Sequence, residues 1–325
     1  MLRNALRAFA VAASLTALAG SALAADQVSL RFNWYLGGLH TPFYLGKERG
    51  YYAEEGIDIT LNEGRGSANT VQVVAAGSDT FGMADAGSLM LVAAKGGEVK
   101  AVMSLLNTSG FGVISLAETG IKTPSDLEGK RLAVTAGDAL TQLFPAIVKS
   151  NHLDMSKITL VQVDPAGKVV SVLEKRADAL LGGIDDQYFL IKYKGFNPVA
   201  MRFADTGANT IGMTILATND TITKRADMVR RFVKATQRSW EAARAEPDAA
   251  VAAALKAKPD LNAQSTKDQL LMDLSLLASP ATAGKPVGWG ADSDWETTKK
   301  LLVEYRDLKT EKPASAFYTN EFISK

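Results

Sequence analysis

Apolar and polar residues alternate along the first third of the chain in a pattern that switches repeatedly between strand and helix. Val28, Leu30 and Phe32 are separated by single polar residues, as in a strand with one buried face. A helix is predicted from Thr41 to Gly56, and further elements follow in turn: strands over residues 57–61, 80–84 and 99–106, and helices over residues 67–76 and 87–95. This alternation predicts a mostly parallel sheet covered by helices.

A second round of the same pattern begins at Val113. It contains predicted strands over residues 131–135, 158–163 and 179–184, and predicted helices over residues 139–150, 168–176 and 186–194. The chain then adds one strand over residues 211–218, followed only by helices, over residues 224–245, 249–256, 266–278, 294–307 and 317–323. Two similar rounds in one chain predict two similar lobes.

The predicted fold class is therefore α/β, with two lobes that are each built on a mostly parallel sheet flanked by helices. The first lobe is discontinuous, residues 25–110 and 206–325, because the chain returns to it after the second round. The second lobe comprises residues 111–205. Glycine and short polar residues near positions 110–112 and 205–209 suit a hinge, where the backbone angles have to change.

Aromatic and polar groups follow the first strand at its carboxyl end, where open α/β sheets bind their ligands. Asn33, Trp34 and Tyr35 stand there, before a Gly-Gly turn. We interpret Trp34 as a stacking face for a planar ligand, and a buried core tryptophan is the alternative. His40 either donates to a ligand or bonds to the backbone at the start of the next helix.

Two further groups of residues are candidates for ligand contact. Arg65 and Ser67 belong to a Gly-rich turn between a strand and a helix, which suits an anion or a polar ring atom. Aspartates follow predicted strands at four positions, and each either accepts hydrogen bonds from a ligand or caps a helix. Asp85 has no obvious capping pattern after it, which favours ligand contact. The candidate ligand-binding residues are Asn33, Trp34, His40, Arg65, Ser67, Asp85, Asp138, Asp185 and Tyr188, with Asp186 weighed beside them.

Composition limits the compartment and the chemistry. Residues 1–24 have the features of a cleaved secretory signal: Arg3 and Arg7, an apolar core, and a small-residue cleavage site at Ala22-Leu23-Ala24. Without them the chain has 34 basic and 35 acidic residues, and no basic stripe indicates nucleic-acid binding. Two histidines and no cysteine give no metal site with standard spacing, and no cofactor is expected. No nucleophile motif indicates a hydrolase.

Several motifs resemble the NMT1/THI5-like family, the SsuA/TauA-related periplasmic substrate-binding proteins of ABC importers. The resemblance is carried first by Asn33, Trp34, His40, Pro42, Gly50, Tyr51, Tyr52, Gly56, Ile57 and Asp58. Blocks at residues 63–67, 82–86 and 120–130 extend it over most of the chain. The resemblance implies a type II-like binding-protein fold. It also implies a monomer in the periplasm that captures a small solute in the cleft between the lobes and delivers it to an importer permease in the inner membrane.

The ligand class is left open between two alternatives. An amino-pyrimidine of the thiamine-precursor type, or another planar heteroaromatic molecule, suits Trp34, His40 and the aspartates. A sulfonate, nitrate or aromatic carboxylate would instead be held by Arg65, Ser67 and helix N-termini. A third possibility is a pyrimidine-precursor synthase of the same superfamily. That branch carries a Cys-rich motif, so a sequence without cysteine predicts a binding protein rather than an enzyme.

Overall fold

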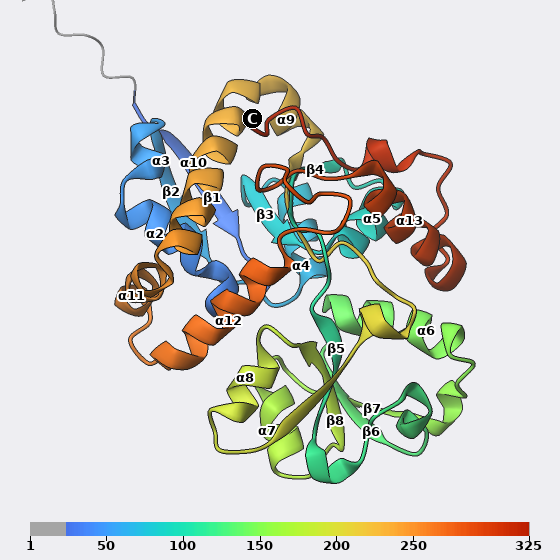
Figure 1. Cartoon of the computed structure of the whole chain (residues 1–325). Coiled ribbons are helices and arrows are strands. Elements are labelled where there is room, and N and C mark those ends of the chain that lie inside the picture. Colours follow the sequence, from blue (N-terminus) through green and yellow to red (C-terminus); the bar gives the residue numbers. More distant parts are fainter. Residues whose placement is uncertain (1–23, 325) are drawn as a thin grey trace, which may run out of the picture.

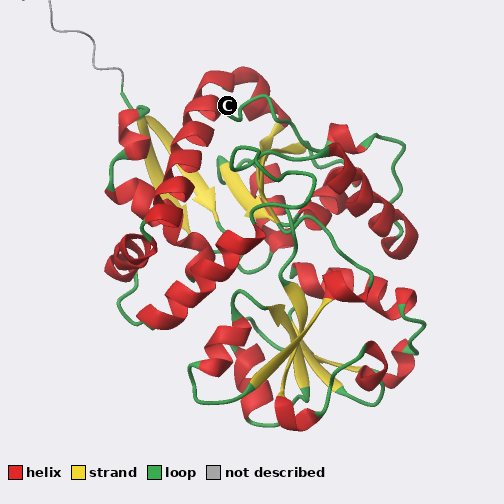
Figure 2. Ribbon diagram, viewed as in Figure 1, coloured by secondary structure: helices red, strands yellow, loops and turns green. Residues whose placement is uncertain are grey.

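The computed structural model describes residues 24–324 and has two lobes, each with a five-stranded sheet flanked by helices (Figures 1 and 2). The first lobe holds the sheet β2-β1-β3-β10-β4 and the second lobe holds the sheet β7-β6-β8-β5-β9. The strands are β1 (Asp26–Arg31), β2 (Ile57–Asn62), β3 (Phe81–Ala84), β4 (Val99–Leu106), β5 (Phe111–Leu116), β6 (Arg131–Val134), β7 (Thr159–Gln162), β8 (Ala179–Gly183), β9 (Pro198–Arg202) and β10 (Met213–Thr218). The two-lobed α/β fold is thus confirmed. The predicted signal at residues 1–24 lies, except for Ala24, outside the described residues.

Helices cover the faces of both sheets (Figure 2). They are α2 (Thr41–Glu48), α3 (Tyr51–Glu54), α4 (Ser67–Ala75), α5 (Ala86–Ala94), α6 (Ala139–Ser150), α7 (Gly167–Leu173), α8 (Gln187–Lys192), α9 (Asn219–Lys224), α10 (Ala226–Ala245), α11 (Pro247–Ala257), α12 (Ala263–Leu276) and α13 (Asp292–Arg306). A short 3-10 helix, η1 (Gly38–His40), precedes α2. Within the described chain, no helix is both long and apolar enough to cross a bilayer.

Each sheet is mixed, whereas mostly parallel sheets were predicted. β1 is parallel to β2 and β3, but β10 is antiparallel to β3 and β4. In the second sheet, β6 is parallel to β7 and β8, while β5 is antiparallel to β8 and β9. β5 and β10 are the strands that the chain enters on crossing from one lobe to the other. Each of these two strands starts at the end of its sheet that faces the other lobe. The parallel strands of the sheet end there, so the entering strand runs antiparallel to them.

Several elements differ from the sequence prediction: the helix predicted over residues 41–56 is divided into α2 and α3, and no strand was predicted where β5 lies. β9 was not predicted, because its short sequence begins with Pro198, and proline is tolerated only at the edge of a sheet. The helix predicted over residues 317–323 is replaced by an irregular segment with one β-bridge, between Tyr318 and Ala101. There the amide of Ala101 donates to the carbonyl of Phe317 at 2.9 Å, and the amide of Thr319 donates to the carbonyl of Ala101 at 2.9 Å. Burial of Phe317 and Phe322 therefore outweighs the local helical spacing.

Aromatic packing fixes the first lobe around the start of α2. Phe81 of β3 stacks on Phe232 of α10 with ring centroids 3.8 Å apart, and Trp240 of α10 meets Phe43 of α2 edge-on at 6.1 Å. Burying such rings contributes a large share of core stability. At the other end of this lobe, α12 packs against η1 and α11 and also reaches α8 of the second lobe, as Figure 1 shows in orange. The lobes are thus held against each other along α12.

The chain crosses between the lobes twice, after β4 and before β10. The lobe boundaries predicted at residues 110–111 and 205–206 stay a prediction, and they fall within these two connections. Gly110 lies close to both lobes: a side chain there would meet Asp185 Oδ1 at 2.9 Å and Leu276 Cδ1 at 3.1 Å. Glycine at this position allows the first crossing to pass between them.

Candidate functional site

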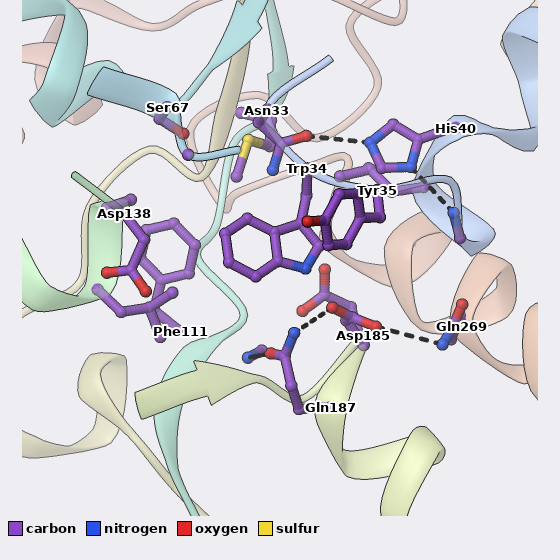
Figure 3. A pocket seen from close by; sticks show the side chains of 18 of the residues that line it. Asn33, Trp34, Tyr35, His40, Ser67, Phe111, Asp138, Asp185, Gln187 and Gln269 are labelled. Atoms are coloured by element: carbon purple, nitrogen blue, oxygen red, sulfur yellow. Dashed lines mark hydrogen bonds between the residues drawn. The ribbon is translucent and has the colours of Figure 1, made fainter. Parts of the chain in front are cut away.

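A cavity lies between the lobes, and both lobes line it (Figure 3). The first lobe supplies the segments that follow β1 and β2, the start of β10, and Gln269 of α12. The second lobe supplies the start of β5, the segment after β6, Lys168 of α7, and the segment after β8. Segments at the carboxyl ends of β1 and β8 therefore meet across the cavity, as expected for an open α/β sheet.

The indole of Trp34 lies in the middle of the cavity (Figure 3). Phe32, the residue two positions earlier, is fully buried and anchors the chain, whereas Trp34 itself is only half-buried. The Tyr35 ring is tilted beside it, with centroids 5.9 Å apart. From the second lobe, Lys168 Nζ lies 5.4 Å from the centroid of the indole, within cation–π range. Trp34 is thus placed as a cavity wall and not as a core residue.

His40 is buried and acts on the cavity through Asn33. Its Nδ1 accepts from the amide of Gly37 at 3.2 Å, so Nε2 carries the proton and donates to Asn33 Oδ1 at 3.0 Å. Burial lowers the pKa of His40 to about 3, and the ring is therefore neutral near pH 7. Both ring nitrogens are occupied by protein partners, so His40 orients the side chain of Asn33 and leaves the Asn33 amide nitrogen for other contacts.

The N-terminus of α4 touches the second lobe at the cavity edge. Gly66 has a φ of 128°, and a side chain there would meet the carbonyl oxygen of Gly137 at 2.8 Å. Two residues further on, in the first turn of α4, the amide of Ala68 donates to that same carbonyl at 3.3 Å. Ser67 lines the cavity and its hydroxyl accepts from the amide of Asp85 at 3.3 Å. The glycines at this point allow the two lobes to approach backbone to backbone.

A buried ion pair joins two helices of the second lobe at the cavity wall. Lys168 Nζ lies 2.5 Å from Asp138 Oδ2, and the two side chains are 1% and 3% exposed. Asp138 also caps α6, because the amide of Thr141 donates to its Oδ1 at 2.6 Å. The sequence left open whether Asp138 caps a helix or faces a ligand. In the structure it caps α6 and also lines the cavity. The pair is neutral as a whole, and the ammonium of Lys168 is already matched by a carboxylate.

Asp185 and Asp186 line the cavity from the loop between β8 and α8. Asp185 is labelled in Figure 3. Asp186 accepts from the side-chain amide of Gln187, and more weakly from that of Gln269 at 3.5 Å. Burial, and then the charge of Asp185, raise the pKa of Asp186 to about 7. Burial also raises the pKa of Asp185. Among the described residues, neither carboxylate has a salt bridge to a basic side chain, so this side of the cavity offers acceptors to a ligand that brings donors.

Three residues proposed from the sequence lie outside the cavity. Arg65 is exposed and is not among the residues that line the cavity. Tyr188 packs within the second lobe, edge-on to Phe189 at 5.3 Å. Asp85 is buried and caps α5, with the amide of Ser88 donating to its Oδ1 at 2.9 Å. The absence of a visible capping pattern after Asp85 was therefore misleading. These positions remove the three residues from our candidate set for ligand contact.

Asp85→Ala should lower the free energy of unfolding by about 1 kcal/mol, because α5 loses its N-terminal cap. Solute affinity should stay unchanged. Urea unfolding and calorimetric titration measure the two quantities. Asp138→Ala is the matched variant, since it removes a cap of the same kind from α6 but inside the cavity, and it should reduce both stability and affinity. A loss of affinity in Asp85→Ala alone would contradict this placement.

The cavity contains residues that the sequence interpretation did not select. Tyr35 had a visible signal, since it follows Trp34 at the end of the first strand. Asp186 was weighed with the other aspartates but was not included among the candidate residues. Lys168 and Gln269 lie on helices far along the chain and carry no local signal, so only tertiary packing brings them to the cavity. Among residues 24–324, no group of three or more His, Asp or Glu side chains is arranged to hold a metal ion.

Comparison with known proteins agrees with this architecture. A family model described as NMT1/THI5 like matches residues 38–250, more than half of the chain. The chain belongs to this family. A formylaminopyrimidine-binding protein of Halalkalibacterium halodurans is 25% identical over 282 residues, which cover 84% of this chain and 83% of that protein.

Two further similarities span nearly the whole chain. A 4-amino-5-hydroxymethyl-2-methylpyrimidine phosphate synthase of Legionella pneumophila is 22% identical over 301 residues, 92% of each chain. The alkanesulfonate-binding protein SsuA from Xanthomonas axonopodis pv. citri, bound to MOPS, superposes with a TM-score of 0.70 at 14% identity. That superposition covers 90% of this chain and 98% of the other. The structural similarity establishes that this chain has the periplasmic-binding-protein fold. Because the sequence identity is only 14%, it establishes the fold alone.

Proposed function

We propose that this protein is the periplasmic solute-binding component of an ABC importer and that its solute is a planar heteroaromatic molecule with amino groups. An amino-pyrimidine of the thiamine-precursor type is the best candidate. The solute would bind in the cavity between the lobes, and the closed protein would deliver it to the importer permease in the inner membrane. Residues 1–24 would direct export to the periplasm, and the protein would act as a monomer.

The observation that carries this proposal is the combination of an aromatic wall with two carboxyl groups that have no salt bridge among the described residues. Trp34 and Tyr35 offer faces for a planar ring, as aromatic side chains do at little entropic cost. Asp185 and Asp186 lie on the same cavity without a salt-bridge partner among the described basic residues, and they suit ring amino groups. The similarity to a formylaminopyrimidine-binding protein supports the same ligand class.

An anionic solute fits the cavity less well. The cation that lines it, Lys168, is already paired with Asp138, and Arg65 lies outside it. Two carboxyl groups at Asp185 and Asp186 would repel a sulfonate or nitrate. The structural similarity to an alkanesulfonate-binding protein concerns the fold, at 14% identity. This leaves the anion as the second candidate.

The similarity to a pyrimidine phosphate synthase raises the question of catalysis. The synthase branch carries a Cys-rich motif, and this chain has no cysteine. We therefore propose binding without chemistry. Incubation of the purified protein with pyridoxal phosphate and iron, followed by product analysis, tests this directly. Formation of a pyrimidine product would overturn the proposal.

A thermal-shift screen across pyrimidines, flavins, sulfonates, nitrate and aromatic acids tests the ligand class. A solute present at 100 times its Kd should stabilise the protein by about 2.7 kcal/mol. We expect amino-pyrimidines to give the largest shift. A larger shift with sulfonates or nitrate than with any heteroaromatic compound would contradict the proposal.

Trp34→Ala should weaken binding of the best compound in that screen by more than about 1 kcal/mol, because the ring loses its stacking face. The thermal transition without solute should change little, since Trp34 is only half-buried. Trp289→Ala is the control: this tryptophan is also partly buried, but it does not line the cavity. Unchanged affinity together with a lowered thermal transition would show that Trp34 serves the core instead.

A further inference from the structure

Three carboxyl groups, one from the first lobe and two from the second, lie where α12 faces the segment before α8. Asp273 lies on α12 of the first lobe and is fully buried, while Asp185 and Asp186 precede α8 in the second lobe. Figure 1 shows α12 lying along the boundary that faces α8. Gln269, one turn before Asp273 on α12, donates to Asp186 Oδ1 at 3.5 Å. A side chain at Gly110 would meet both Asp185 Oδ1 at 2.9 Å and Leu276 of α12 at 3.1 Å, so this part of α12 lies against the two aspartates. The cluster therefore spans the interface at which the lobes separate or close.

No hydrogen-bond donor among the described residues stabilises an ionised Asp273 carboxylate. In the described part of the chain, neither of its carboxylate oxygens has a hydrogen-bond partner. A fully buried, ionised carboxylate without partners is strongly unfavourable, so the group takes up a proton instead. The Asp185–Asp273 pair resembles other close carboxyl pairs, in which like charges prevent both groups from ionising together.

The elements packed against α12 bring no cation to this cluster. On η1, His40 is neutral and bonded to Gly37 and Asn33. On α8, Lys192 is half-exposed and lies 3.6 Å from Asp268 at the surface. On α11, the charged side chains pair outward, Asp248 with Lys267 and Lys256 with Glu48. Lys168 acts on Asp186 over a distance but is held by Asp138.

The titration of the three groups follows from this environment. Burial is the first cause in each case: it raises the pKa of Asp185, and it raises the pKa of Asp186 to about 7. Burial, and then the neighbouring carboxylates, raise the pKa of Asp273 well above its usual range. A raised pKa in the closed state means that proton binding stabilises closure at low pH, and that this stabilisation is lost as the pH rises through the raised values.

We propose that Asp273 and Asp185 form a proton-sharing latch between the lobes. A proton held between the two carboxyl groups stabilises the lobes in contact, and loss of that proton leaves two facing carboxylates that drive the lobes apart. For one proton, the ratio of closed to open protein falls up to tenfold for each pH unit above the titration of the pair. The cavity therefore opens and releases its solute more readily at alkaline pH. This inference does not depend on which solute binds.

The test uses the purified protein without solute. Small-angle X-ray scattering between pH 5.5 and 9 should show the radius of gyration of the wild type increasing with pH. Asp273→Asn should stay compact over the whole range, because its amide donates to Asp185 as the protonated carboxyl group does, and it cannot lose that donor. Asp248→Asn is the control: it removes one carboxylate at the surface, and it should follow the wild type.

Carbon-13 NMR of labelled aspartate carboxyl groups gives a second measurement. We expect one resonance that titrates well above the usual range of an aspartate and that is missing from Asp273→Asn. A wild-type radius of gyration that stays constant would overturn the latch, as would an Asp273 carboxyl group that titrates near pH 4. An increase of the radius in Asp273→Asn equal to that of the wild type would also overturn it.

Discussion

Lys168→Met should lower the free energy of unfolding by about 3–5 kcal/mol, the largest effect expected of any single substitution considered for this protein. Lys168 and Asp138 are 1% and 3% exposed, and their charged atoms lie 2.5 Å apart. Methionine fills a similar volume but leaves Asp138 as an uncompensated buried charge. Urea unfolding at pH 7 measures the loss. Solute affinity should also fall, because Asp138 and Lys168 both line the cavity.

A double variant separates the charge from the packing. Asp138→Asn keeps an oxygen to accept from the amide of Thr141, so α6 retains its cap while the charge is removed. In the Lys168→Met/Asp138→Asn variant we therefore expect most of the lost stability to return. Lys157→Met is the control at the surface, where the pair with Glu128 is exposed and contributes little. A double variant no more stable than Lys168→Met alone would show that packing dominates.

The sequence predicted the elements best where the periodicity was strong and local. The strand at Val99–Leu106 and the helix at Ala139–Ser150 were predicted with the bounds that the structure has. The apolar residues of each element form a face that must be buried, whichever elements pack against it. Strand direction is different, because whether β5 and β10 run parallel to their neighbours depends on how the chain crosses between lobes. No pattern within a single element contains that information.

The site shows the same division between local and tertiary signals. Asn33, Trp34, His40, Ser67, Asp138 and Asp185 line the cavity, and each follows a predicted strand or begins a predicted helix. Asp85 and Asp138 have the same local setting, a carboxylate between a strand and a helix, and both cap that helix. Asp138 lines the cavity and Asp85 does not. Their difference depends on the placement of the lobes, which sequence spacing does not encode.

Asp186→Asn should weaken binding of an amino-heteroaromatic solute by about 1.5–3 kcal/mol, or roughly 10- to 150-fold in Kd, because a charge-assisted acceptor is lost. Burial raises the pKa of Asp186 to about 7, so the measurements are made at pH 8.5, where the ionised carboxylate predominates. Calorimetric titration at two salt concentrations gives the affinity. The contribution should depend little on salt, since the group is shielded within the cavity.

The same variant distinguishes the second ligand class by the sign of its effect. For a sulfonate, nitrate or aromatic carboxylate, neutralising Asp186 removes a repulsion, and Asp186→Asn should then bind more tightly than the wild type. Arg65→Gln is the control for both classes, because Arg65 is exposed and outside the cavity, so its loss should change neither affinity. Tighter binding by Asp186→Asn would therefore contradict the amino-heteroaromatic proposal and leave the solute-binding role intact.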